Sequence, residues 1–373
     1  MAIQQTGLFE EFRLRDVVIP NRVGLAPMSL YSAQGGRVQQ WHHIHYGARS
    51  FGVGLVVVEA TSVSPEGRAT PADLGLWEDG QVDGVAGLVE TIVAGGAVPG
   101  IQLSHAGRKA SRSVPWEGDL PIEPADGGWA SVGPSATAFA DGYRRPRALM
   151  AEECGLIAKQ FADAAKRAVA AGFRFVEIHA AHGRLLHSFY SPQSNHRTDG
   201  YGGSFEGRTR LLGEVVRAVR GAIGEGIPLC VRLSCVDWLD DGWLLQDSVR
   251  LAAALRVDGA DMIDCSSGGI TRPLRVPLSA GYQVEFAEGI RRDAGIPTAA
   301  VGLIRDMGQA ERILMGGRAD MVFLGRALVA DPLLVLRDLL RDRPSAMELV
   351  PPQYRRALGL GREQGVIDHL PEL

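Results

Sequence analysis

Two histidines and an arginine follow a short apolar run in residues 178–189, which read IHAAHGRLLHSF. His179 and His182 are three residues apart, and Arg184 is two residues further on. Two neutral imidazoles held side by side donate hydrogen bonds that hold an oxyanion or polarise a carbonyl group. The same pair also suits a metal site, or a structural role as hydrogen-bonded residues at the end of a strand. The spacing alone leaves these three interpretations open.

The elements that must position these residues are eight short apolar runs, each followed by a segment with helical periodicity. Strands that are buried on both faces of a parallel sheet have this near-continuous apolar character. The turn GxGxxG that opens a doubly wound dinucleotide-binding sheet does not follow the first run, which continues as APMSLYSAQGG. We therefore predict an α/β fold, a single (β/α)8 TIM barrel. Its strands are expected at residues 22–28, 54–60, 98–104, 173–179, 228–234, 260–266, 297–302 and 319–325.

Two of the intervening segments carry helix-end signals. Residues 204–224 read SFEGRTRLLGEVVRAVRGAIG, and residues 306–317 read DMGQAERILMGG. In the second segment Asp306 is the expected N-cap and Gly316 the expected stop, because a short acidic side chain caps main-chain amides and glycine ends helices. A helix is therefore predicted in each segment.

The residues at the carboxyl ends of the predicted strands are unusually polar, and barrel enzymes place their chemistry at that end. The last two strands run into AVGLI and FLGRALVADP. Their small residues allow main-chain amides to point at a phosphate, and Arg326 could clamp it, although glycine after a strand is also an ordinary turn residue. The strand-end residues are Ser29, Tyr31, Glu59, Thr61, Gln102, His105, His179, His182, Arg232, Ser266, Ser267, Gly302, Gly325 and Arg326.

A metal site would need further ligands beside the first histidine pair. His43 and His45 supply an HxH spacing in WHHIHYGARS, but they lie in a segment with helical periodicity and not at a strand end. Neither a carboxylate nor a lysine stands where a bridging ligand is expected. A metal-dependent TIM-barrel hydrolase is therefore the alternative from a different functional class, and no metal is predicted.

Composition narrows the range of partners. The 373 residues are 46% hydrophobic and 22% charged, with a net charge of −4, which gives no reason to expect a nucleic-acid or polybasic membrane partner. The four cysteines form no CxxC pair, and the N-terminus MAIQQTGLFEEF lacks a secretion signal. We expect a reduced, cytoplasmic protein that acts on a small molecule.

Two segments fall outside the strand–helix alternation. Residues 105–150, after the third predicted strand, are rich in glycine, proline and tryptophan, and a connection of that length in a compact domain is usually a functional lid or cap. Residues 351–373 follow the last expected helix of the barrel. We therefore divide the chain into a barrel over residues 1–350 and a C-terminal tail over residues 351–373.

The chain resembles the Old Yellow Enzyme family of FMN-dependent ene-reductases, and within it the thermophilic-like class that includes bacterial xenobiotic reductases. The resemblance covers nearly the whole chain, and residues 195–208 match a segment that is expected to be scaffold for the loop. The motifs that carry it are LFEEFRLRDVVIPNRVGLAPM, GIQLSHAGRKAS, FVEIHAAHGRLLHSFYSPQSNHRTDGYGGSFEGRTR, AVGLI and FLGRALVADP.

The resemblance implies FMN across the mouth of the barrel. It places the isoalloxazine ring against the backbone of Pro27, Met28 and Ser29 and near Ala60, with Gln102 bonded to the pyrimidine edge. The implied activity takes hydride from NADPH or NADH and passes it from flavin N5 to an activated carbon–carbon double bond or a nitro group. An alternative within the oxidoreductases is the reverse reaction, desaturation or aromatisation of a substrate.

The same resemblance assigns the rest of the cofactor site. Arg232 would lie by flavin N1 and the C2 oxygen, where a fixed positive charge stabilises the anion that forms on reduction. Gly302, Gly325 and Arg326 would hold the phosphate, as the strand-end argument also proposes.

The substrate side is implied in the same way. His179 and His182 would bond the carbonyl or nitro oxygen of the ligand over the flavin, and Tyr31 would face the same pocket. In this class an arginine near the C-terminus reaches the site of a neighbouring subunit, and QYRR places Arg356 there. A homodimer or a higher homo-oligomer is therefore expected.

The chain departs from the family at two positions. Ser29 stands where the family has cysteine or threonine, which is expected to change the flavin potential but not binding. Arg184 stands where the family has a tyrosine that donates a proton, and arginine is a poor general acid because it stays protonated. Arginine binds anions well, so we predict a substrate with a carboxylate, phosphate or similar acidic group. The alternative is a structural Arg184 that pairs with Glu153 or Asp199.

Overall fold

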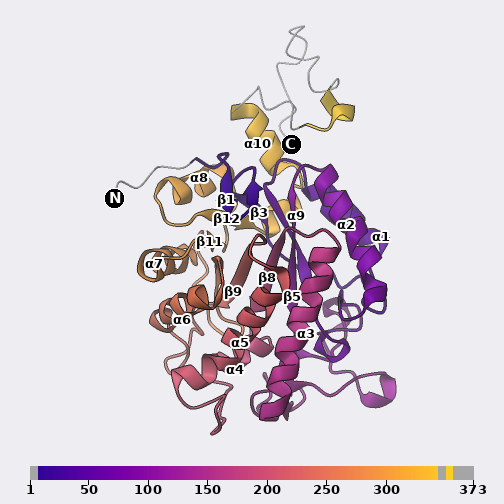
Figure 1. Cartoon of the computed structure of the whole chain (residues 1–373), viewed down its shortest axis with the longest axis vertical. Coiled ribbons are helices and arrows are strands. Elements are labelled where there is room, and N and C mark those ends of the chain that lie inside the picture. The colour runs from indigo at the N-terminus through magenta and orange to yellow at the C-terminus, as the bar shows by residue number, and fades with distance from the viewer. Residues whose placement is uncertain (1–6, 343–349, 356–373) are drawn as a thin grey trace.

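The computed structural model describes residues 7–342 and 350–355, and its centre is a closed barrel of eight parallel strands (Figure 1). Around the barrel the strands follow one another in chain order, from β3 through β12 and back to β3. The predicted (β/α)8 barrel is therefore confirmed. The barrel strands are β3 (Val23–Leu25), β4 (Leu55–Ser62), β5 (Val98–Ser104), β8 (Phe175–Ala180), β9 (Leu229–Ser234), β10 (Met262–Ser266), β11 (Thr298–Ala300) and β12 (Met321–Leu324).

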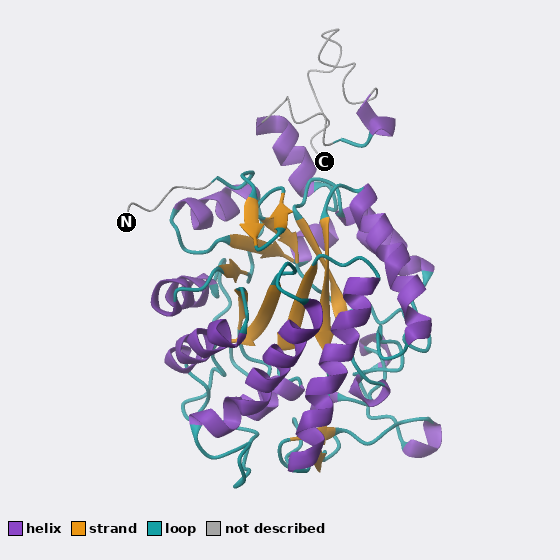
Figure 2. Ribbon diagram, viewed as in Figure 1, coloured by secondary structure: helices purple, strands orange, loops and turns teal. Residues whose placement is uncertain are grey.

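Helices surround the barrel (Figure 2), because parallel strands need crossover connections and those connections cover the outside of the sheet. The longest of them, α3 and α5, pack against each other on one side. The helices are α1 (Gln40–Arg49), α2 (Val82–Ala94), α3 (Ala151–Ala170), α4 (Leu185–Tyr190), α5 (Phe205–Ile223), α6 (Leu245–Asp258), α7 (Val284–Ala294), α8 (Met307–Met315), α9 (Arg326–Ala330) and α10 (Leu334–Asp342).

A short antiparallel hairpin, β1 (Phe12–Leu14) and β2 (Val17–Ile19), closes the amino-terminal end of the barrel. Its apolar side chains form one buried cluster with barrel residues such as Phe175 and Phe323. The hairpin lies at the opposite end of the barrel from α4 (Figure 1). The carboxyl ends of the strands are therefore the end left open for a ligand.

Both helices predicted from end signals are present. The hydroxyl of Ser204 accepts a hydrogen bond from the main-chain amide of Gly207 at the start of α5, at 3.1 Å. The carboxylate of Asp306 accepts one from the amide of Gln309 at the start of α8, at 2.7 Å, and Gly316 follows the last residue of that helix. These side chains satisfy amides that the first turn of a helix leaves without a partner.

The long connection after β5 contains little regular structure. It holds the short helices η3 (Gly107–Lys109), η4 (Pro115–Glu117) and η5 (Pro124–Asp126) and the paired strands β6 (Val132–Gly133) and β7 (Arg147–Ala148). The amide of Leu185 donates to the carbonyl oxygen of His105 at 2.9 Å, which ties the start of this connection to the loop after β8. The connection therefore lies at the open end of the barrel.

Arg356, and with it most of the predicted tail over residues 351–373, lies outside the part of the chain that the structure describes. The four cysteines are buried and free. Among the described helices, none combines the length and the apolar character that a membrane span requires.

Candidate active site

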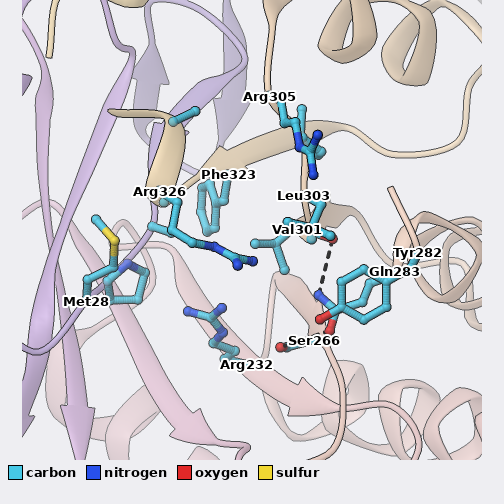
Figure 3. A pocket seen from close by; sticks show the side chains of 16 residues that line it. Met28, Arg232, Ser266, Tyr282, Gln283, Val301, Leu303, Arg305, Phe323 and Arg326 are labelled. Atoms are coloured by element: carbon cyan, nitrogen blue, oxygen red, sulfur yellow. Dashed lines mark hydrogen bonds between the residues drawn. The ribbon is translucent and has the colours of Figure 1, made fainter. Parts of the chain in front are cut away.

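A cavity of about 550 Å³ opens at the carboxyl ends of β9 to β12 and of β3 (Figure 3). Three guanidinium groups belong to its lining, those of Arg232, Arg305 and Arg326, and the side chains of Arg232 and Arg326 both extend into the same space. Its volume lies in the range of small-molecule and cofactor sites. The cavity is suited to an elongated molecule that carries negative charge.

Of the nine residues predicted to bind the flavin, six line this cavity: Pro27, Met28, Arg232, Gly302, Gly325 and Arg326. Ser29 is partly exposed and directly follows Met28, while Ala60 and Gln102 are buried on β4 and β5. These last three lie outside the lining of the cavity.

Two pairs of polar groups lie inside the barrel at this end. The amide of Gln102 donates to Glu177 Oε1 at 2.7 Å, and Arg232 Nε lies 3.1 Å from Asp264 Oδ2. Burial raises the pKa of Glu177 to about 8 and that of Asp264 to about 6, with Arg232 acting in the opposite direction on both. Several of these buried atoms, Arg232 Nε among them, lack a hydrogen-bond partner within the described chain. Of these four side chains, that of Arg232 lines the cavity.

The predicted histidine pair is present as a pair. The rings of His179 and His182 are 5.3 Å apart and nearly perpendicular. His179 Nδ1 accepts the amide of Ala181 at 3.2 Å, so the proton of the neutral ring lies on Nε2. His182 Nε2 lies 2.7 Å from the hydroxyl of Ser266, which lines the cavity. Both rings are thus fixed by local hydrogen bonds.

Both histidines are neutral. Burial is the main cause that lowers the pKa of His179 and His182 well below 6.5, and nearby positive charges lower it further. Those charges are carried by Arg232, Lys109 and Arg184. Neutral imidazoles donate hydrogen bonds without carrying charge, so the pair fits the role of stabilising negative charge that develops on a ligand oxygen.

Close backbone packing positions the loop that follows β8. His182 has a φ of 57°, and Gly183 has a φ of 71°, a conformation that favours glycine. A Cβ on Gly183 would lie 2.2 Å from the carbonyl oxygen of Gly269, in the loop after β10. The amide of His182 donates to Ser234 Oγ at 2.9 Å. The loop is therefore locked against the ends of β9 and β10.

The third histidine of the motif is structural. His187 is fully buried, and its Nε2 lies 2.9 Å from Asp237 Oδ1, while its Nδ1 accepts the amide of Gly183 at 2.8 Å. Tyr190, the last residue of α4, is also fully buried, and its hydroxyl donates to the carbonyl oxygen of Ala180 at 2.9 Å. Burial raises the pKa of Tyr190 well above its usual value. These two residues hold the loop and do not face a ligand.

Tyr31 and Arg184 line a second cavity, of about 350 Å³. Three other cationic residues line it as well, Lys109, Arg112 and Arg272. Arg184 is half-buried, and among the residues that the structure describes its guanidinium makes neither a hydrogen bond nor an ion pair. Tyr31 and Arg184 therefore share one cavity, and its lining includes neither His179 nor His182.

The proposed structural partners of Arg184 are paired with other arginines. Glu153 forms an ion pair with Arg147 at 2.7 Å, and Asp199 accepts from Arg197 Nε at 2.9 Å. Neither of the two structural pairings considered for Arg184 forms. Arg197 also donates to the carbonyl oxygen of Pro134 at 3.1 Å, which agrees with a scaffold role for residues 195–208.

Sequence reasoning missed several lining residues. Arg305 lines the first cavity and directly follows AVGLI. It could have been predicted as the first cationic residue after the strand that was expected to bind the phosphate. Gln283 and Tyr282 precede α7 and carry no motif. Lys109, Arg112 and Arg272 reach the second cavity from two irregular segments, for which the sequence has no periodic signal.

The alternative metal site is not present in the described chain. His45 is buried on α1, and His43 Nδ1 lies 2.9 Å from Thr91 Oγ1. Within residues 7–342 and 350–355, no group of three or more histidine, cysteine or acidic side chains is arranged to hold a metal ion.

A buried carboxyl group holds the loop that lines the first cavity. Glu59 Oε2 accepts the amide of Leu30 at 2.8 Å, and Glu59 Oε1 lies 3.5 Å from His42 Nε2. Burial raises the pKa of Glu59 to about 8 and lowers that of His42, so the contact joins two neutral groups at pH 7. Glu59 therefore connects the end of β4 to the segment that contains Met28 and Tyr31.

Comparison with known proteins gives consistent matches. A model described as the NADH:flavin oxidoreductase / NADH oxidase family matches residues 7–340. The NADPH dehydrogenase of Geobacillus thermodenitrificans (strain NG80-2) is 45% identical over 330 residues, which are 88% of this chain and 92% of that protein. The NADPH dehydrogenase of Halalkalibacterium halodurans is 41% identical over 358 residues, 94% of this chain and 98% of that protein. Among solved structures, morphinone reductase matches with a TM-score of 0.77 and 30% identity over 91% of each chain.

The raised pKa of Glu59 predicts a specific pH dependence for Glu59→Gln. A group that gains protons on folding stabilises the fold at low pH, and this contribution falls as the pH rises from about 4.5 to about 8. The amide lacks this titration, so the unfolding free energy of the variant should rise relative to wild type over that range, by up to about 1.4 kcal/mol per pH unit. Chemical denaturation at several pH values measures it, with Glu90→Gln on the exposed face of α2 as the control. A difference that does not change with pH would contradict the assignment.

Proposed function

The chain belongs to the NADH:flavin oxidoreductase / NADH oxidase family, that of the old yellow enzymes, and we propose that it reduces an electron-poor double bond or a nitro group in an acidic small molecule. It is an NAD(P)H-dependent FMN oxidoreductase. FMN, when bound, accepts hydride from NAD(P)H and donates it to the substrate. The observation that carries the proposal is the neutral pair His179 and His182 beside the unpaired cation Arg184.

The first cavity fits FMN. The phosphate of FMN is an anion, and Arg305 and Arg326 supply positive charge beside the main chain of Gly302 and Gly325. A Cβ on Gly302 would lie 2.8 Å from the side chain of Gln283, and its φ of 114° also requires glycine. Arg232 Nε is held by Asp264 at 3.1 Å, and the guanidinium extends into the cavity, which supports the proposal that this side chain faces the polar edge of the flavin ring.

His179 and His182 are proposed to bind the carbonyl or nitro oxygen of the substrate. The Nε2 proton of His179 is available because its Nδ1 already accepts a main-chain amide. Negative charge increases on the substrate oxygen as hydride arrives, so donors fixed before the reaction stabilise the transition state more than the ground state. The pair thereby draws electron density away from the bond that is reduced.

Arg184 is proposed to bind the acidic group of the substrate. Its guanidinium lines the second cavity. The two acidic residues that could have paired with it, Glu153 and Asp199, form ion pairs with other arginines instead. A charge-assisted hydrogen bond to a carboxylate or phosphate contributes roughly 1.5–3 kcal/mol. This contact would orient the molecule so that its reducible group reaches the histidine pair.

The proton that completes the reduction of a double bond needs another source, because a guanidinium stays protonated. Tyr31 lines the same cavity as Arg184, and burial raises its pKa against the opposite effect of Arg184. Its phenol therefore keeps its proton at neutral pH. We assign proton donation to Tyr31 or to water in this cavity, and nitro groups, whose limiting step needs no such donor, are the acceptors we expect to react fastest.

The proposed activity is tested with the purified protein under anaerobic conditions. NADPH or NADH should reduce bound flavin, which is seen as loss of its visible absorbance, and denaturation should release FMN. Adding nitrobenzene or 2-cyclohexen-1-one should restore the absorbance. A flavin that neither nucleotide reduces, or one that no activated alkene or nitro compound reoxidises, would overturn the proposal.

Replacing either histidine should weaken ligand binding without loss of FMN. In His179→Ala or His182→Ala the hydroxyl of phenol loses one donor, which costs on the order of 2–4 kcal/mol if each acts as an oxyanion donor. Titration of the FMN-loaded protein with phenol, followed by the flavin spectrum, measures this effect, and flavin content per chain is the control. If both variants bind phenol as tightly as wild type, the pair is structural.

Arg184→Tyr should improve the reduction of a simple enone and weaken the binding of an acidic substrate. The variant loses the cation and gains a proton donor, so 2-cyclohexen-1-one should be reduced faster and the KM for 4-nitrobenzoate should rise about tenfold or more. Nitrobenzene, which lacks the carboxylate, serves as the matched control. A variant whose kinetics with all three compounds equal those of wild type would show that Arg184 is only structural.

A further inference from the structure

The second cavity collects positive charge from three separate parts of the chain. Lys109 and Arg112 come from the connection after β5, Arg184 from the loop after β8, and Arg272 from the loop after β10. Tyr31 and Tyr143 add hydroxyl groups to the wall. These cations are far apart in the sequence, so their convergence is a property of the folded chain.

Asp119 is the acidic residue in the lining of the second cavity, and both of its carboxylate oxygens accept hydrogen bonds. Its Oδ1 accepts from Arg112 Nε at 2.7 Å. Its Oδ2 accepts from the hydroxyl of Tyr143 at 3.0 Å and from Arg272 Nη1 at 3.1 Å. One carboxylate is therefore shared between two arginines, and neither arginine is fully compensated.

A second carboxylate lies behind the wall, where its hydrogen bonds are satisfied locally. Asp73 is buried, and it accepts from the amide of Ala69 at 2.7 Å and from the hydroxyl of Thr70 at 2.7 Å. Burial raises its pKa and the charge of Arg184 lowers it, but no ion pair joins the two within the described chain. The lining itself thus holds three guanidinium groups, those of Arg112, Arg184 and Arg272, and one carboxylate, that of Asp119, so the excess is two positive charges before Lys109 is counted.

Lys109 links this excess to the active site. Its ammonium donates to the carbonyl oxygen of His182 at 2.9 Å and lies 4.3 Å from the centre of the Phe139 ring. Burial and the neighbouring guanidinium groups of Arg184, Arg272 and Arg108 lower the pKa of Lys109 well below its usual value. A bound anion would raise that pKa again, because an opposite charge nearby favours the charged form. Lys109 therefore joins the wall of this cavity to the loop that carries His182.

We propose that this cavity binds a phosphate-type oxyanion, a phosphate monoester or a phosphonate with two negative charges, on the molecule that occupies the active site. The inference rests on the proposed function and names the acidic group. Guanidinium groups match the geometry of phosphate oxygens, and Arg184 and Arg272 line the same cavity from two different loops. A carboxylate would compensate half of the excess charge, whereas a dianion compensates all of it.

The phosphate group has two possible sources, which share this chemistry. It belongs either to the electron acceptor or to the nicotinamide nucleotide, whose phosphates would lie beside the same histidine pair during flavin reduction. The two half-reactions of the enzyme separate these sources, since the nucleotide takes part in one and the acceptor in the other.

The first measurement compares three ligands of the FMN-loaded protein: phenol, 4-hydroxybenzoate and 4-hydroxyphenylphosphonate. The flavin spectrum reports binding, without turnover. The phosphonate should bind at least about tenfold more tightly than the benzoate. Arg272→Gln should weaken phosphonate binding about fivefold and leave phenol binding unchanged, and the exposure of Arg272 favours folding of the variant. Arg144→Gln is the matched control, because Arg144 pairs with Glu123 in the same connection outside the cavity.

The second measurement assigns the source. If the phosphate belongs to the acceptor, Arg272→Gln should raise the KM for 4-nitrophenylphosphonate and leave flavin reduction by NADPH and NADH unchanged. If it belongs to the nucleotide, the concentration of NADPH or NADH that gives half-maximal reduction should rise; both results support the inference. Phosphonate that binds no more tightly than the benzoate, or an Arg272→Gln variant that matches Arg144→Gln in every assay, would overturn it. Failure of the proposed function is distinct, because the flavin would then resist reduction by either nucleotide.

Discussion

The hydrogen bonds around His182 determine where both halves of the site lie. The amide of His182 donates to Ser234, its carbonyl oxygen accepts from Lys109, and its ring contacts Ser266. A backbone at a φ of 57° is uncommon for histidine and persists only where its surroundings hold it. These contacts come from β9, β10 and the connection after β5, so the loop cannot shift without disturbing three neighbours. The ring of His182 lies beside Ser266 of the first cavity, and Arg184 lines the second.

The charge around the loop explains why the histidines and the cationic cavity occur together. Arg232, Lys109 and Arg184 lower the pKa of the two imidazoles, in addition to burial. The pair therefore stays neutral and donates hydrogen bonds without needing a carboxylate partner. Asp264 compensates Arg232, but Arg184 pairs with no acidic residue of the described chain, and Arg112 and Arg272 share Asp119. An anionic substrate would supply the missing charge, so its recognition and the protonation state of the histidines have one physical origin.

The barrel could be predicted because its strands are buried on both faces, which produces eight apolar runs in the sequence. Strand-end positions then follow from the fold class, and most of the predicted flavin residues line one cavity for that reason. The hairpin before β3 escaped prediction because its strands are only three residues long. The second cavity escaped because Arg112 and Arg272 come from segments without periodicity and meet only in the folded chain. Glu153, one of the two acidic residues considered as a structural partner of Arg184, pairs instead with Arg147, which is near it in the sequence.

The most direct test of this account is the position of a bound acidic phenol in a crystal of the FMN-loaded protein. With 4-hydroxybenzoate, the account predicts that the phenol oxygen lies within hydrogen-bonding distance of His179 and His182, and that the carboxylate points into the cavity of Arg184 and Lys109. A ligand bound with its carboxylate away from that cavity, while Arg184 pairs with an acidic residue of the protein, would contradict the central claim.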